Sequence, residues 1–86
     1  MADHDVYLYA LSTCPWCRKT KRFFEERSVR FSYVDVDTLP EDEGERVAEE
    51  AATKGGTRAF PVTLIDGQVT VGYDPGRFAE LLGVQE

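Results

Sequence analysis

The chain has 86 residues, of which 42% are hydrophobic and 30% are charged, and its formal net charge is −6. This length predicts a single domain spanning residues 1–86, and no apolar run approaches the ~20 residues of a membrane-spanning helix. The acidic balance argues against general binding of nucleic acid. We therefore expect a small globular protein whose partners include neither nucleic acid nor a membrane.

The first predicted elements are a strand and a helix. The segment Met1 to Asp5 carries two aspartates and no lysine or arginine, so it resembles neither a signal peptide nor a transit peptide, and the expected location is the cytoplasm. Residues Val6 to Leu11 are largely apolar on both faces, which is typical of a central strand covered on both sides. Two hydroxyl residues end this strand, and Pro15 suits the first turn of a helix that should run to about Arg27.

A second strand and a second helix follow. Residues Phe31 to Val36 are rich in β-branched and aromatic residues, which predicts a strand. Thr38 and Glu41 have the spacing of a capping box, so we expect a helix with Thr38 at its N-cap and its end at Gly55-Gly56. The narrow apolar stripe of this helix consists of Val47, Ala48, Ala51 and Ala52.

The last part of the chain predicts a hairpin and a third helix. Asp66-Gly67 joins the runs Val62 to Ile65 and Gln68 to Val71, which is a strong hairpin pattern. Asp74 caps the final helix. The expected buried face of that helix consists of Phe78, Leu81 and Leu82. The element order (βαβαββα) predicts an α/β fold with a four-stranded mixed sheet and helices on both faces.

The chain has only two cysteines, and they enclose Pro15 and Trp16 at the predicted start of the first helix. A disulfide closing so short a loop adds little stability, so reversible chemistry is the better explanation of the pair. If Cys14 is the N-cap, the N–H groups of Trp16 and Cys17 point at its sulfur, and with the helix dipole they favour the thiolate. Cys14 is therefore predicted to be the attacking thiolate and Cys17 the resolving thiol.

Basic residues surround this motif. Six of the ten in the chain follow it closely: Arg18, Lys19, Lys21, Arg22, Arg27 and Arg30. They form either a solvated helix face or a positive field that favours a thiolate and attracts anionic partners. A zinc site uses the same cysteine spacing, but it needs two more ligands, and His4 is the only other soft ligand. We therefore expect no bound metal.

This pattern resembles the glutaredoxin family of the thioredoxin fold over nearly the whole chain. The family motif is usually Cys-Pro-Tyr-Cys, from which Trp16 departs conservatively, and the family's cis-proline matches Pro61 in Phe60-Pro61-Val62. The resemblance implies a thioredoxin fold of glutaredoxin type and a monomeric thiol–disulfide oxidoreductase that acts on disulfide-containing proteins. It also implies that the Phe60 backbone pairs with a substrate peptide as an added strand.

The resemblance extends in part to glutathione-using members. It implies that Arg58, the Phe60 backbone, Gly72 and Asp74 hold the carboxylate and amine ends of glutathione. Two further residues, Thr13 and Tyr73, are candidates for contacts with substrate or glutathione. Trp16 and Tyr73 have two interpretations, as aromatic groups that cover an incoming disulfide or as residues that only fill space. Four groups that the glutathione users carry are replaced by Leu11, Ala59, Val71 and Pro75.

The electron donor is therefore open between two subgroups. The segment Val71 to Pro75 also looks like the Gly-Phe-Arg-Pro segment of glutaredoxin-like redoxins that serve ribonucleotide reductase and take electrons from thioredoxin reductase. Those redoxins usually lack the proline that this chain has at position 15. Glutathione as a co-substrate, with no bound cofactor, is the first expectation, and a thioredoxin-reductase-like donor is the second. A third hypothesis, an iron–sulfur cluster carrier, is opposed by Pro15 and Cys17.

Overall fold

A computed structural model describes residues 4–85. Within this range the elements follow one another as β1 (Val6–Ala10), α1 (Pro15–Glu26), β2 (Ser32–Asp35), the short 3-10 helix η1 (Val36–Thr38), α2 (Glu41–Gly55), β3 (Val62–Ile65), β4 (Gln68–Val71) and α3 (Pro75–Leu82). None of the helices in this part of the chain combines the length and the apolar character needed to cross a bilayer.

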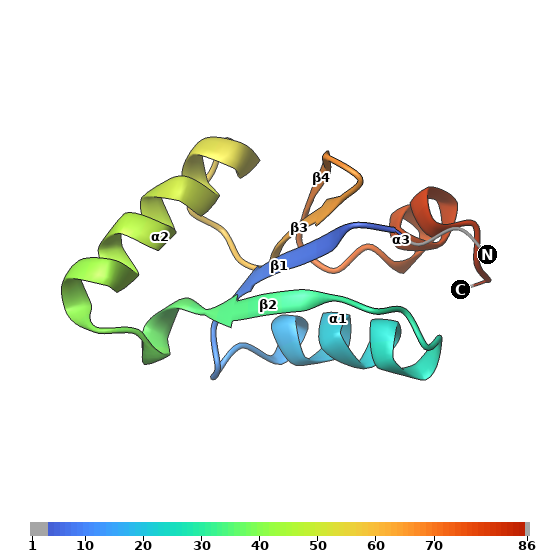
Figure 1. The fold of residues 1–86 in the computed structure, drawn as a ribbon, viewed down its shortest axis with the longest axis horizontal. Helices are drawn as coiled ribbons and strands as arrows, with labels where there is room; N and C mark the ends of the chain where they lie inside the picture. Colours follow the sequence, from blue (N-terminus) through green and yellow to red (C-terminus); the bar gives the residue numbers. More distant parts are fainter. Residues whose placement is uncertain (1–3, 86) are drawn as a thin grey trace.

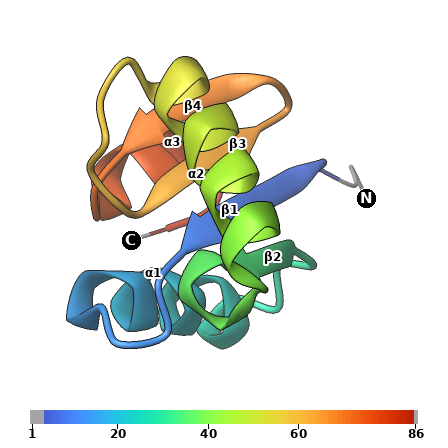
Figure 2. The ribbon, with the colours of Figure 1, turned by 90° about the vertical axis from the view of Figure 1, so that its left-hand side faces the viewer.

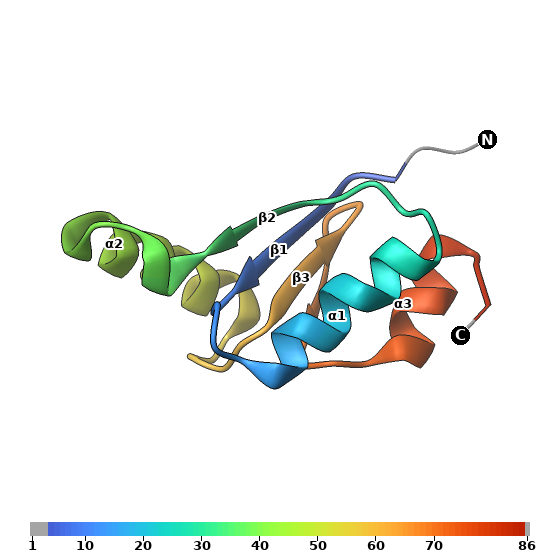
Figure 3. The same ribbon diagram turned by 90° about the horizontal axis from the view of Figure 1, so that it is seen from below.

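The four strands form one mixed sheet in the order β2-β1-β3-β4, so β1 lies in its interior (Figure 1). β1 runs parallel to β2 and antiparallel to β3, and β3 and β4 form the antiparallel hairpin. Helices α1 and α3 lie beside each other over one face (Figure 3), whereas α2 covers the other face and stands in front in Figure 2. The predicted α/β architecture is confirmed.

The alternation of side chains along β1 explains why helices cover both faces. Val6 points to a cluster in which Phe24 of α1 and Phe78 of α3 are completely buried. Tyr9, three residues on, points to the opposite face, where it packs with Ala51 of α2. Burial of each large apolar side chain contributes roughly 1.5–3 kcal/mol, so both helix layers are fixed to this central strand.

The capping box predicted for the second helix is wrong. Thr38 belongs to η1, where its hydroxyl donates a hydrogen bond to the Asp35 carbonyl at 2.8 Å. Helix α2 begins at Glu41 with Pro40 at the N-cap and no side-chain cap. The cause is steric, because a residue before proline is disfavoured in helical conformation and Leu39 accordingly has ψ 157°. The helix therefore cannot extend back to Thr38.

Smaller differences concern element ends and one buried face. β1 ends at Ala10 rather than Leu11, and β2 covers only Ser32–Asp35, because its pairing with β1 stops at the Ala10–Asp35 pair. In α3, Leu81 is half-buried at the rim of the cluster, and Ala79 takes a buried position instead.

Two threonines leave buried hydroxyls without hydrogen bonds. Thr63 and Thr70 are direct cross-strand partners in β3 and β4 and are both buried. Within residues 4–85, neither hydroxyl oxygen has a hydrogen-bond partner. A buried polar group without a partner costs about 1–3 kcal/mol of desolvation free energy.

Thr63→Val is therefore expected to raise the free energy of unfolding by about 1 kcal/mol, because valine has nearly the same shape and no hydroxyl to desolvate. Urea denaturation followed by circular dichroism measures the change. Thr57→Val, at an exposed position, is the matched control and should leave the midpoint unchanged. A lower midpoint for Thr63→Val would show that its hydroxyl is satisfied in the folded protein.

Candidate active site

Cys14 is the N-cap of α1, immediately after the loop that leaves β1. Its backbone is extended (φ −87°, ψ 117°), and Pro15 occupies the first turn of the helix. The Cys17 N–H donates a hydrogen bond to Cys14 Sγ at 3.3 Å. Of the two N–H groups that the sequence places near this sulfur, that of Cys17 makes the bond. Cys14 is half-buried, and its sulfur lies at the positive end of the helix dipole.

Cys17 lies behind Cys14 and is completely buried. Burial, followed by the hydrogen bond and charge of Cys14, raises the pKa of the Cys17 thiol to about 12. Two groups act in the opposite direction: the Leu11 N–H donates to Cys17 Sγ at 3.5 Å, and the positive charge of Lys21 lies nearby. The two cysteines therefore differ in access to solvent. The Cys17 thiol stays protonated as long as Cys14 has not formed a disulfide.

The loop before Cys14 is fastened to η1. The Ser12 N–H and hydroxyl both donate hydrogen bonds to the Asp37 carboxylate, at 2.7 and 2.5 Å. These bonds hold the pKa of Asp37 below its usual range. This pair was not predicted from the sequence, although the order of the elements indicates it. Ser12 and Asp37 follow the carboxyl ends of β1 and β2, which run parallel, and such ends share one edge of a sheet.

Trp16 presents an aromatic surface beside the cysteines. Its side chain is 54% exposed and stacks on Tyr73 with ring centroids 5.9 Å apart. Tyr73 in turn packs edge-on against Phe78 of the core, at 6.3 Å. The Lys19 ammonium lies 4.6 Å from the centre of the Trp16 ring. Trp16 therefore does not fill the core. Tyr73 links the Trp16 ring to Phe78 of α3.

Pro61, Phe60 and Gly72 lie together next to the cysteine motif. The Phe60-Pro61 peptide bond is cis, and the Gly72 N–H donates to the Pro61 carbonyl at 2.8 Å. Gly72 has φ +87°, a value that favours glycine. Phe60 and Cys14 both pack against the buried cluster that contains Cys17. The structure thus brings these predicted residues to one place.

The remaining predicted contacts are engaged elsewhere or exposed. Asp74 caps α3, since its Oδ1 accepts a hydrogen bond from the Arg77 N–H at 3.1 Å. Arg58 is exposed and forms an ion pair with Glu49 of α2. Thr13 is exposed. A carboxylate arriving at Arg58 must therefore compete with Glu49.

Two thiols at the start of the helix that follows an interior strand, opposite a cis-proline, define a dithiol oxidoreductase of thioredoxin fold. A family model described as Glutaredoxin matches residues 6–70. The chain is 34% identical over 77 residues to a glutaredoxin-like 8.6 kDa protein in the rubredoxin operon of Clostridium pasteurianum, covering 90% of this chain and 96% of that protein.

Solved structures agree with this match. The methanoredoxin of Methanosarcina acetivorans is 34% identical with a TM-score of 0.86, over 92% of this chain and 84% of that one. The glutaredoxin of Archaeoglobus fulgidus is 32% identical with a TM-score of 0.85, over 95% and 87%. The chain belongs to the glutaredoxin family of thiol–disulfide oxidoreductases.

At pH 7, iodoacetamide is expected to modify Cys14 and to spare Cys17, because Cys17 is inaccessible and its pKa is raised to about 12. Peptide fragmentation by mass spectrometry locates the modified residue. In urea both thiols should react, which is the control for intrinsic reactivity. Equal modification of the two cysteines in the native protein would contradict the assigned burial.

Proposed function

We propose that this glutaredoxin-family redoxin reduces protein disulfides and mixed disulfides with glutathione, with Cys14 as the attacking thiolate and Cys17 as the resolving thiol. The observation that carries the proposal is the asymmetry of the pair. Cys14 Sγ lies half-buried at the helix N-terminus, whereas Cys17 is buried one turn behind it. The proposed location is the cytoplasm, which maintains a supply of reduced thiols.

The first step is attack on the substrate. The Cys14 thiolate attacks one sulfur of the substrate disulfide, a Cys14–substrate disulfide forms, and the other substrate sulfur leaves as a thiolate that takes up a proton. The hydrogen bond from the Cys17 N–H stabilises Cys14 Sγ when it is anionic, both before attack and when it later leaves. Phe60, which packs against the same cluster as Cys14, places its backbone within the same site.

The second step depends on a change at Cys17. In the mixed disulfide Cys14 is neutral, so its hydrogen bond and charge no longer raise the pKa of Cys17. The Leu11 N–H and Lys21 then favour the Cys17 thiolate without that opposition. Cys17 loses its proton and attacks Cys14 Sγ, the bond between Cys14 and the substrate breaks, and the Cys14–Cys17 disulfide forms. The second substrate sulfur leaves as a thiolate and takes up a proton. Two electrons pass to the substrate.

Glutathione is the first candidate for the electron donor, because the motif with Pro15 and Trp16 resembles glutathione-using members. Two glutathione molecules would reduce the Cys14–Cys17 disulfide and form glutathione disulfide. Two observations favour the second candidate, a thioredoxin-reductase-like enzyme. Arg58 is paired with Glu49, and Asp74 is used as a helix cap, so neither group is ready for glutathione.

The assigned roles predict different behaviour for two serine variants. Cys17→Ser should accumulate one mixed disulfide per chain with glutathione disulfide, because the resolving sulfur is missing. Cys14→Ser should form none, because the remaining sulfur is buried. Intact-mass spectrometry after acid quenching distinguishes the products, with the wild-type protein as the control. Interchangeable behaviour of the two variants would refute the assignment.

The donor is tested by measuring reduction of a protein disulfide with either glutathione, glutathione reductase and NADPH or thioredoxin reductase and NADPH. We expect turnover with glutathione. Glu49→Gln should lower the KM for glutathione a few-fold, since it releases Arg58. Glu45→Gln, an exposed carboxylate of the same helix, is the control and should change little. Turnover with thioredoxin reductase and none with glutathione would reverse the order of donors and preserve the dithiol mechanism.

A further inference from the structure

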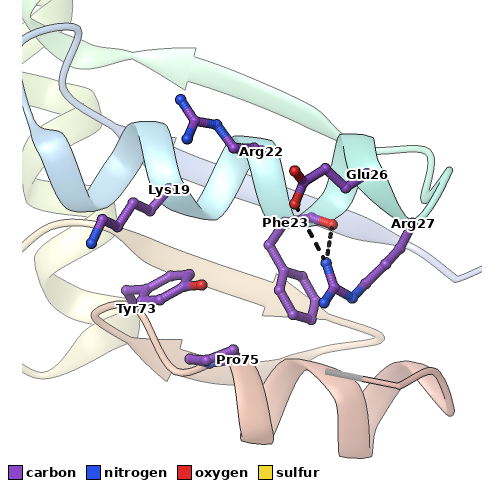
Figure 4. A pocket seen from close by; sticks show the side chains of 7 residues that line it. All are labelled: Lys19, Arg22, Phe23, Glu26, Arg27, Tyr73 and Pro75. Atoms are coloured by element: carbon purple, nitrogen blue, oxygen red, sulfur yellow. Dashed lines mark hydrogen bonds and ion pairs between the residues drawn. The ribbon is translucent and has the colours of Figure 1, made fainter.

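A groove of about 390 Å³ lies between α1 and the start of α3 (Figure 4). Lys19 and Arg22 of α1 and its C-cap Arg27 line this side of the groove, and Tyr73 closes it from the turn that precedes α3. In Figure 4 the Lys19 side chain points toward Tyr73, whereas the guanidinium of Arg22 points away from it. None of the residues predicted to contact glutathione lines this groove except Tyr73. We refer to it as the α1 groove.

The α1 groove begins beside the reactive cysteine. Tyr73 lines it and stacks on Trp16, which is two residues from Cys14. From Lys19 to Arg27 the groove follows the helix for roughly 12 Å at 1.5 Å per residue. This length matches about three to four residues of extended polypeptide at ~3.3 Å each. A segment adjacent to a substrate cysteine bound at Cys14 is therefore within reach of the groove.

The charge of the α1 groove is opposite to that of the whole protein. Three cations and one carboxylate, Glu26, line it, whereas the chain carries a net charge of −6. Arg27 is held in place by hydrogen bonds to the carbonyls of Phe23 and Gln85. In the described part of the chain, no carboxylate lies within ion-pairing distance of Lys19 or Arg22. These two cations are free to pair with a partner.

We propose that the α1 groove binds an acidic, extended segment of the protein whose disulfide is reduced, with carboxylates at Lys19 and Arg22 and an apolar side chain against Tyr73. This proposal rests on the proposed dithiol function and adds the chemistry that selects its protein partners. The acidic remainder of the surface repels such a segment, so the positive groove also sets its direction of approach.

The test uses synthetic peptides that share one intramolecular disulfide and differ in a flanking tail of three glutamates, three glutamines or three lysines. Pre-reduced protein is mixed with excess peptide, so that no electron donor is involved. Samples are quenched with acid, and the reduced peptide is measured by chromatography. At low ionic strength the glutamate peptide should be reduced about tenfold faster than the glutamine peptide, and the lysine peptide should be reduced more slowly than the glutamine peptide. The differences between these rates should shrink in 0.5 M salt.

Matched variants separate the groove from the net charge. Arg22→Gln should reduce the advantage of the glutamate peptide over the glutamine peptide to about threefold or less. Arg30→Gln removes the same charge from an exposed position outside the groove and should retain the advantage. Retention of the advantage in Arg22→Gln, or its equal loss in both variants, would overturn the proposal.

Two further results have distinct meanings. Equal rates for the three peptides would refute the α1 groove as a selective site and preserve the dithiol function, whereas failure to reduce any peptide would refute the proposed function itself. A larger effect of Arg22→Gln on the rate with glutathione disulfide than on the rate with the glutamate peptide would identify glutathione as the occupant and overturn the proposal.

Discussion

The hydrogen bond from the Cys17 N–H to Cys14 Sγ, at 3.3 Å, sets the geometry of the whole site. It exists because β1 is an interior strand whose end is fixed and because Pro15 starts α1 directly after Cys14. The same turn places Cys17 inside the protein, in a buried cluster with residues of β1. The N-cap position of Cys14 therefore determines that the Cys14 sulfur meets the substrate and that the Cys17 sulfur is buried behind it.

This arrangement makes the pKa of the Cys17 thiol depend on whether Cys14 is free or bound in a disulfide. Cys17 is disfavoured as a thiolate by burial and by the neighbouring Cys14, while the Leu11 N–H and Lys21 favour it. Of these effects on the pKa of Cys17, only that of Cys14 changes during the reaction. The loop that carries the Leu11 N–H is held by the two hydrogen bonds between Ser12 and Asp37. These bonds hold the Leu11 N–H beside Cys17 Sγ.

The sequence was sufficient for the features that depend on local pattern. The interior strand, the N-cap at Cys14, the hairpin and the cap at Asp74 all follow from residues close together in the chain. The start of α2 was mispredicted because the restriction that Pro40 places on its preceding residue overrides the capping spacing. The hydrogen bonds of Ser12 with Asp37 join residues 25 positions apart, so they follow from the parallel pairing of β1 and β2 and not from any local pattern.

The basic residues that follow the cysteine motif in the sequence do not all contribute positive charge at the cysteines. Lys21 forms an ion pair with Asp35 at 2.9 Å and lies over the Tyr33 ring, so much of its field is neutralised next to Cys17. Arg27 is fixed against its own helix and the C-terminal segment. Of the other four, Lys19 and Arg22 line the α1 groove. Lys19 lies over the Trp16 ring and Arg22 lines the groove farther along α1, so these two charges act on the approach of a partner more than on the chemistry of the thiols.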